Sequence, residues 1–426
     1  MLTTFTAPAF AKTWYIEDGD ITISASETKG TNKVSQGAEP EVEDTGTIIT
    51  NREKDASSHT VTINAGNDKV EVTLDNVNIK ADSGSALISK GDVTLTLKGD
   101  NHLTGGNGGS SSYGGDGITS SGSLTISGGT VTATGGDSTS SVGSGGSGIY
   151  SVSGDVTISG GTVNANGGDG KNGSGGGSGI DSSGGVTVSG GTVTANGGDS
   201  KDGDGGSGGY GISSLDHVAI SGGTVKSNGG SGNLSGGNGI ISYDIDLSGS
   251  LELTAKAGSP NGKALSRVGS ELDLNTIKDK LDPGAKVTAT DADGKVIQQV
   301  SIPRPVEPEE PSSSSDSGSA TPSAPASFLP GLTVTDKDGQ RISYTSTQSG
   351  NTLTVCVGRF MASLRISLAT LRQLRAEGIE TITFQTILCS TTLSVDELLA
   401  MGGEDTEVVL THHIRSSTLT VGGKAV

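Results

Sequence analysis

The stretch VTISGGTVNANGGD, residues 156–169, decides the fold. Its central motif Ser-Gly-Gly-Thr-Val begins at Ser127, Ser159, Ser189 and Ser221, at intervals of 32, 30 and 32 residues. An alternating strand pattern precedes each copy, a second strand and a Gly-rich loop follow it, and a Gly-Ile pair opens the next unit. Features that recur in one order at one period indicate a repeat architecture.

Each repeat predicts three short strands and therefore one coil of a parallel β-helix. Apolar Val, Ile and Leu alternate with Thr, Ser and Asp, so the apolar side chains should point inward. Coils would pair in parallel about 4.8 Å apart, with glycine supplying positive φ at the corners. Degenerate repeats at both ends should cap the stack. A β-propeller is excluded because each blade needs four strands in some forty residues.

The predicted fold class is all-β, with a small α+β domain after the solenoid. Residues 1–11 are interpreted as a signal-peptide remnant, and 12–302 as the solenoid, with repeats of about 31 residues. Residues 303–330 hold seven of the eleven prolines between Ser and Glu, which indicates an extended linker. Residues 331–426 form the accessory domain, where Ser367 and Ser394 are predicted helix caps.

Export is indicated at the N-terminus, where Ala9-Phe10-Ala11 fits a small-x-small cleavage site and Lys12 would begin the mature chain. We therefore expect a secreted or cell-surface protein. No later segment is apolar enough to span a membrane. The formal charge of −19 argues against a nucleic-acid partner, because phosphate binding needs clustered Lys and Arg. Cys356 and Cys389 could form a disulfide or remain two buried thiols.

A polar column follows the second strand of each repeat. Its members each come after a Gly-Gly pair: Asn107, Asp137, Asp169, Asp199 and Ser231. Stacked carboxylates would repel unless the loops splay or a hard cation such as calcium bridges them. Asp137, Asp169 and Asp199 are thus candidate calcium ligands or an edge for acidic sugars, although Asp also suits a Gly-rich turn. A second column, Thr134, Asn166, Asn196 and Asn228, is interpreted as a structural amide ladder.

Candidate sugar-binding residues lie in and beside the Gly-rich loops, whose variable length marks a solvent face. The most charged loops contain Lys171 in one repeat and Lys201, Asp202 and Asp204 in the next. Tyr150 and Tyr210 lie near the loop ends, where an aromatic face could stack on a sugar ring. Their offsets from the Gly-Ile pair differ, so incidental surface tyrosines are the alternative.

Several segments resemble a family of bacterial surface proteins called carbohydrate-binding domain-containing proteins. The segments are WYIEDGDI at 14–21, VTLDNVNI at 72–79, GDN at 99–101 and the TISGGTV units, and the resemblance covers about residues 12–300. It implies a right-handed parallel β-helix of the pectate-lyase-like type, export, and polysaccharide binding, with calcium as a cofactor to be tested. No cell-wall sorting signal is recognisable, which leaves any association with the cell wall open.

The predicted function is polysaccharide binding without catalysis. A lyase needs a strong base beside a charge-neutralised uronate, commonly with Arg, yet no Arg occurs between Arg52 and Arg267. A structural stalk or adhesin of the cell surface is the main alternative, because its sequence would look much like that of a polysaccharide-binding solenoid.

Overall fold

The computed structural model divides the chain into two compact units, residues 1–308 and 309–426, and each is considered by itself. The described residues are 12–109, 113–140, 143–203, 205–267, 269–303, 332–336, 341–342, 344–349, 351–357, 361–386, 390–403, 406–412, 417–422 and 424–425. The predicted signal remnant, Asp204 and all but Pro303 of the predicted linker lie outside them.

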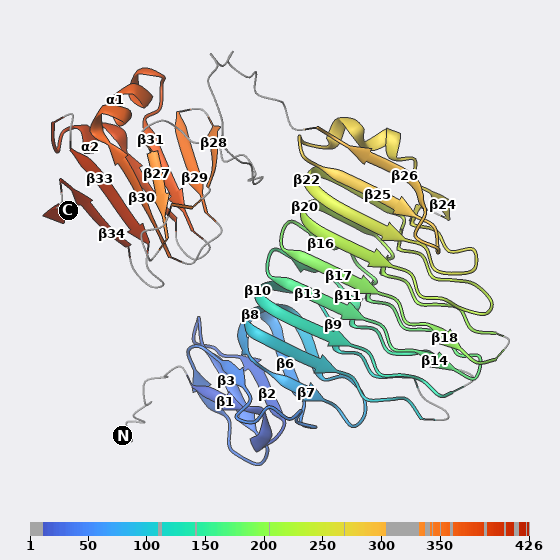
Figure 1. The fold of residues 1–426 in the computed structure, drawn as a ribbon. Helices are drawn as coiled ribbons and strands as arrows, with labels where there is room; N and C mark the ends of the chain where they lie inside the picture. Colours follow the sequence, from blue (N-terminus) through green and yellow to red (C-terminus); the bar gives the residue numbers. More distant parts are fainter. Residues whose placement is uncertain are drawn as a thin grey trace, which may run out of the picture. The chain divides into compact units, whose positions relative to one another are not determined.

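The first unit is a parallel β-solenoid of about nine turns, which confirms the predicted fold class (Figure 1). One column of side chains with no exposed surface runs through all of its coils. In register order the column is Ile21, Val61, Leu87, Ile118, Ile149, Ile180, Ile212, Ile240 and Leu265. Burial of such branched apolar chains is the main stabilising term of the stack, about 25 cal/mol per Å² of apolar surface.

The strands form three stacks, as the three-strand repeat predicts. The stack that carries the Ile column contains β2 (Ile21–Ala25), β9 (Ile118–Ser121), β11 (Ile149–Ser153), β15 (Ile180–Ser182), β19 (Ile212–Ser214), β21 (Ile240–Ser242) and β23 (Leu265–Arg267). The second and third contain β7 (Asn78–Lys80), β12 (Val156–Ile158), β13 (Thr162–Asn166), β16 (Val186–Val188), β17 (Thr192–Asn196) and β25 (Lys286–Thr290). Long strands continue through the corners: β6 (Val61–Asp75), β8 (Leu87–Thr104), β10 (Leu124–Thr134), β20 (His217–Asn228) and β22 (Asp244–Lys256).

The predicted amide ladder is confirmed on the third stack. The side-chain amide of Asn196 donates to the Oδ1 of Asn166 at 2.8 Å, and Asn228 donates to Asn196 at 2.7 Å. The glycine corners are also confirmed, since Gly161, with φ +77°, lies at the turn between the second and third stacks.

Both ends of the solenoid depart from the repeat and cover its core. The N-terminal cap contains β1 (Thr13–Tyr15), η1 (Ile16–Asp18), β3 (Asn32–Gln36), β4 (Val42–Asp44) and β5 (Ile48–Thr50). The C-terminal cap contains β24 (Ser270–Glu271), η2 (Leu274–Lys280) and β26 (Val296–Ser301). Antiparallel pairs β2–β3 and β25–β26 replace parallel ones at the two ends. The degenerate terminal repeats therefore act as caps, as expected.

Five consecutive coils extend an arm between two glycine pairs, and we call these segments the arms: 105–115, 135–146, 167–177, 197–209 and 229–237. At the base of each arm the outgoing and returning chains touch through glycine alone. The backbone bonds of this glycine ladder run from Gly136 N–H to Gly115 O, Gly146 to Gly136, Gly168 to Gly146 and Gly177 to Gly168, each 2.8 Å long. Buried serines, including Ser174 and Ser200, fill the arms in place of apolar side chains.

The second unit is a small α+β domain, as predicted. One sheet contains β27 (Leu332–Thr335), β30 (Ala362–Ser367), β33 (Glu407–His412), β34 (Ser417–Val421) and β35 (Lys424–Ala425). The other contains β28 (Thr345–Ser349), β29 (Thr352–Cys356), β31 (Thr381–Gln385) and β32 (Ser390–Ser394). The helices α1 (Leu368–Ala376) and α2 (Val395–Leu399) begin after Ser367 and Ser394, whose hydroxyls accept from Thr370 N and Glu397 N. Both predicted caps are confirmed.

Cys356 is a free thiol whose sulfur lies 3.5 Å from Gln385 Oε1, and burial raises its pKa. Its predicted disulfide partner, Cys389, lies outside the described residues. In the described segments no helix is long and apolar enough to cross a membrane.

Candidate functional site

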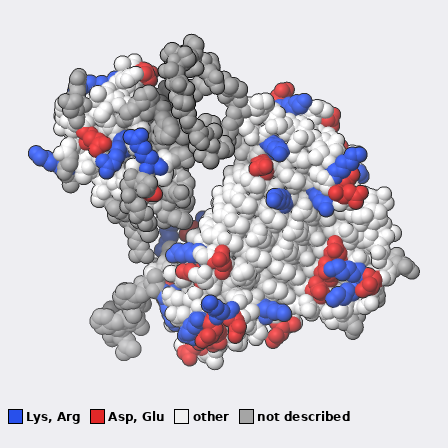
Figure 2. Space-filling view, in the orientation of Figure 1, with Lys and Arg blue, Asp and Glu red and all other residues white. Residues whose placement is uncertain are grey.

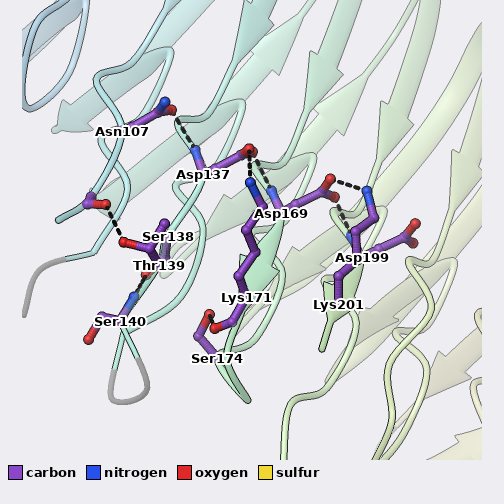
Figure 3. Close-up of polar contacts among 11 residues, drawn as sticks. Asn107, Asp137, Ser138, Thr139, Ser140, Asp169, Lys171, Ser174, Asp199 and Lys201 are labelled. Carbon is purple, nitrogen blue, oxygen red and sulfur yellow. Dashed lines mark hydrogen bonds and ion pairs between the residues drawn. The ribbon is translucent and has the colours of Figure 1, made fainter. Parts of the chain in front are cut away.

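The predicted aspartate column stacks along one edge of the arms, and Figure 3 shows its contacts. The first four members, Asn107 to Asp199, each accept a hydrogen bond from the backbone of the next coil through one side-chain oxygen. Asn107 Oδ1 accepts from Asp137 N at 3.0 Å, Asp137 from Asp169 at 2.9 Å, Asp169 from Asp199 at 2.9 Å and Asp199 from Ser231 at 2.8 Å. The column is therefore part of the ladder that stacks the arms.

The second oxygen of two of these carboxylates pairs with a lysine of the following coil. Lys171 Nζ lies 3.5 Å from Asp137 Oδ2, and Lys201 Nζ binds Asp169 Oδ2. The hydrogen bond from Lys201 to Asp169 and the negative charges of the column raise the pKa of Lys201. Figure 2 shows the resulting cluster of both charges over β14 (Gly170–Lys171) and β18 (Ser200–Lys201). The two lysines therefore relieve the repulsion between the stacked carboxylates, for which the sequence leaves splayed loops or a bridging cation as alternatives.

Calcium binding by Asp137, Asp169 and Asp199 stays a prediction. Among the described residues no group of three or more His, Cys, Asp or Glu side chains is arranged to hold a metal ion. Of the other predicted loop residues, Asp202 is exposed at the tip of its arm with φ +63°, a conformation that Asn172 shares one coil earlier. We therefore interpret Asp202 as a turn residue, because Asp and Asn adopt the left-handed conformation of turns more readily than most residues do.

Tyr150 and Tyr210 lie on the Ile-column stack, beside the returning ends of the arms. Tyr150 points outward from β11, between its register partners Thr119 and Asp181. Tyr210 directly precedes Gly211 and β19, is 37% exposed, and its carbonyl accepts from Gly179 N at 2.8 Å. We give the name tyrosine face to the two tyrosines and the polar residues beside them on this stack: Asp116, Thr119, Tyr150, Asp181, Tyr210 and the buried Ser213. The structure thus brings both predicted tyrosines onto one stack, although in different columns.

Two carboxyl groups of this face, those of Asp116 and Asp181, have pKa values raised by burial. Asp116 accepts from Ser147 N at 2.7 Å and from Thr119 Oγ1 at 2.6 Å. Burial raises the pKa of Asp116 against these hydrogen bonds, and the charge of Asp181 raises it further. Burial also raises the pKa of Asp181, opposed by a hydrogen bond from Ser213. No described cation lowers the pKa of either group, so the tyrosine face holds two carboxylates without a compensating positive charge.

Because the pKa of Asp181 is raised, we expect Asp181→Asn to increase the stability of the folded protein in a pH-dependent way. A raised pKa favours folding at pH values below the pKa of the unfolded chain, about 3.9, and this contribution is lost as pH rises through the folded-state pKa. At pH 7 the amide should therefore raise the melting temperature above that of the wild type. The difference should vanish below about pH 4, where the wild-type carboxyl is neutral.

Thermal melts of wild type and variant from pH 3 to pH 8 test this prediction. Asp202→Asn changes an exposed carboxylate in a turn and is the control, with little effect expected at any pH. An Asp181→Asn protein that gains stability equally at pH 3 and pH 7 would mean that packing, and not charge, is responsible.

The tyrosine face was only partly predictable. The tyrosines follow from the sequence as aromatic residues near the loop ends, whereas Asp116 and Asp181 do not stand out because each is the single Asp in its column. The available signal was their place in the repeat: Asp116 directly precedes the Gly-Ile pair, and Asp181 directly follows it.

Comparison with known proteins adds no further assignment. Searches against protein-family models, curated proteins and solved structures found no match to this chain. The resemblance to bacterial carbohydrate-binding surface proteins therefore remains a prediction from the sequence.

Proposed function

We propose that the solenoid is a secreted or cell-surface protein that binds a polysaccharide across its tyrosine face, without cleaving it. One observation supports this proposal above the others: Tyr150 and Tyr210 lie on the same strand stack as two carboxylates that have no described cation partner. Tyrosine rings stack on the apolar C–H faces of sugars, and carboxylates accept hydrogen bonds from sugar hydroxyls.

The charge of the site favours a neutral glycan. Asp116 and Asp181 would repel a uronate, and so would the chain's net charge of −19. A linear polymer suits a linear repeat, because neighbouring coils offer weak subsites whose contacts add up along one chain.

Replacing both tyrosines by alanine should weaken glycan binding by about tenfold or more, because each stacking contact contributes about 0.5–1.5 kcal/mol beyond its buried area. A glycan array with the wild type identifies the polysaccharide, and titration calorimetry then compares the Tyr150→Ala/Tyr210→Ala protein with it. Tyr113→Ala, which removes a tyrosine that is 68% exposed on an arm, is the matched control and should bind normally.

Wild-type affinity in the double variant would place the binding surface elsewhere. Absence of any polysaccharide ligand for the wild type would favour the structural stalk. New reducing ends or unsaturated uronate ends in the incubated polysaccharide would contradict the claim that the protein is not an enzyme.

The calcium hypothesis is tested in the same titration, with calcium and with chelator. A neutral glycan should bind equally in both conditions. An acidic glycan would need calcium at the arm edge, and the triple variant Asp137→Asn/Asp169→Asn/Asp199→Asn should then lose this binding. The triple variant should remain folded, because an amide oxygen can still accept the backbone hydrogen bonds and each exposed ion pair contributes only about 0–1 kcal/mol.

A further inference from the structure

The N-terminal cap buries a carboxylate at the point where the described chain begins. Asp44, the last residue of β4, has no exposed surface. Its Oδ2 accepts from the indole N–H of Trp14 at 2.8 Å, and its Oδ1 accepts from the backbone N–H groups of Lys12 at 3.0 Å and Gly46 at 3.2 Å. All three donors are uncharged. None of the ion pairs between described residues includes Asp44.

Lys12 is held to the same site by its side chain. Its ammonium lies 3.6 Å from the centre of the Trp14 ring, which is itself buried. Lys12 is therefore held by two contacts, one from its backbone nitrogen to Asp44 and one from its ammonium group to the Trp14 ring. A buried carboxylate is costly unless it is paired, and three neutral donors compensate its charge less well than a cation does.

We propose that the exported protein begins at Lys12 and that its new α-ammonium group forms an ion pair with Asp44. The step is hydrolysis of the Ala11–Lys12 peptide bond by a leader peptidase that recognises small-x-small sites. One water is consumed, Ala11 keeps a carboxylate, and the Lys12 nitrogen gains protons and a positive charge. The same nitrogen that donates a neutral N–H to Asp44 Oδ1 then supplies the missing counter-charge.

This inference rests on the proposed export and is independent of glycan binding. It makes processing a stabilising event, because the cap gains its charge partner only after cleavage. Before cleavage, during translocation, the N-terminal cap would be less stable. After cleavage and export, the ion pair would stabilise it.

Three forms of the otherwise complete chain test the proposal: one that begins at Lys12, one with a single Gly before Lys12, and one that begins at Nα-acetylated Lys12. The latter two keep a neutral N–H at Lys12. We expect the first form to melt about 5 °C or more above the other two, which should resemble each other. Equal melting temperatures for all three would overturn the ion pair.

The same comparison in Asp44→Asn should abolish the advantage of the free amine. If that variant does not fold, acylation of the wild-type α-amine by an amine-reactive reagent gives a second readout. The amine should react at least about tenfold more slowly in the folded protein than in denaturant. Equal rates would contradict the contact. Mass spectrometry of protein recovered outside a cell that expresses the natural gene should find Lys12 at its N-terminus, and any other first residue would overturn the proposed site.

Discussion

A chain that carries Ile158→Asp is expected to be unfolded in its solenoid at room temperature. Ile158 has no exposed surface and is stacked between Ile126 and Val188 of the adjacent coils. A carboxylate at this position would meet only apolar neighbours, and burial of a polar or charged group without a partner costs more than about 4 kcal/mol. Because each coil contacts only its neighbours, a break in the middle removes two interfaces at once.

Far-ultraviolet circular dichroism and denaturant titration measure this effect. Thr157→Asp is the matched control: it adds the same charge one residue earlier on the same strand, where period-two alternation turns the side chain outward. We expect this control to retain the β-spectrum and a cooperative transition. A soluble, unchanged Ile158→Asp protein would contradict the register of the solenoid.

Gly177→Ala should have the second largest effect, although it adds one methyl group. A Cβ at this position would lie 1.9 Å from the carbonyl oxygen of Gly146 and 2.6 Å from its carbon, both backbone atoms. Gly146 belongs to the neighbouring arm, so the returning chains of the two arms would have to move apart, which would break the ladder bonds that join Gly177 to Gly168 and Gly198. Overpacking against rigid backbone in two coils predicts a loss of about 3 kcal/mol or more.

Gly160→Ala is the control for this substitution. Gly160 belongs to the same repeat, its added Cβ would meet no atom within 4 Å, and its φ is not positive. Denaturant titration of the two proteins should therefore separate a general cost of removing glycine from the specific cost of opening the ladder. Equal stabilities would show that the arms open without affecting the coils.

The two predictions concern different kinds of interior. Ile158 belongs to an apolar core that any parallel solenoid requires, whereas Gly177 belongs to the glycine ladder, where backbone packs directly against backbone. If the tyrosine face binds a glycan, the ladder matters for binding as well, because Tyr210 follows directly after the returning glycines of its arm. Gly177→Ala would then also weaken glycan binding, because loss of the ladder would displace Tyr210 although Tyr210 itself is not substituted.

The sequence by itself determined the coils, the corners and the caps. These features depend on local patterns: period-two alternation around Ile158, positive φ at Gly161 and helix caps at Ser367 and Ser394. The amide ladder of Asn166 and Asn196 was also predictable, because identical residues one repeat apart must stack in a parallel solenoid.

Only the tertiary structure decided which charges meet. Lys171 forms an ion pair with Asp137 of the preceding coil, because the stacking of the arms places the lysine beside that coil. The burial of Asp116 and Asp181 likewise depends on neighbouring arms and strands, and the contact between Lys12 and Asp44 joins residues 32 apart. Periodicity specifies which residues lie in one column, but distances, burial and ion pairs between columns follow from how whole coils pack against each other.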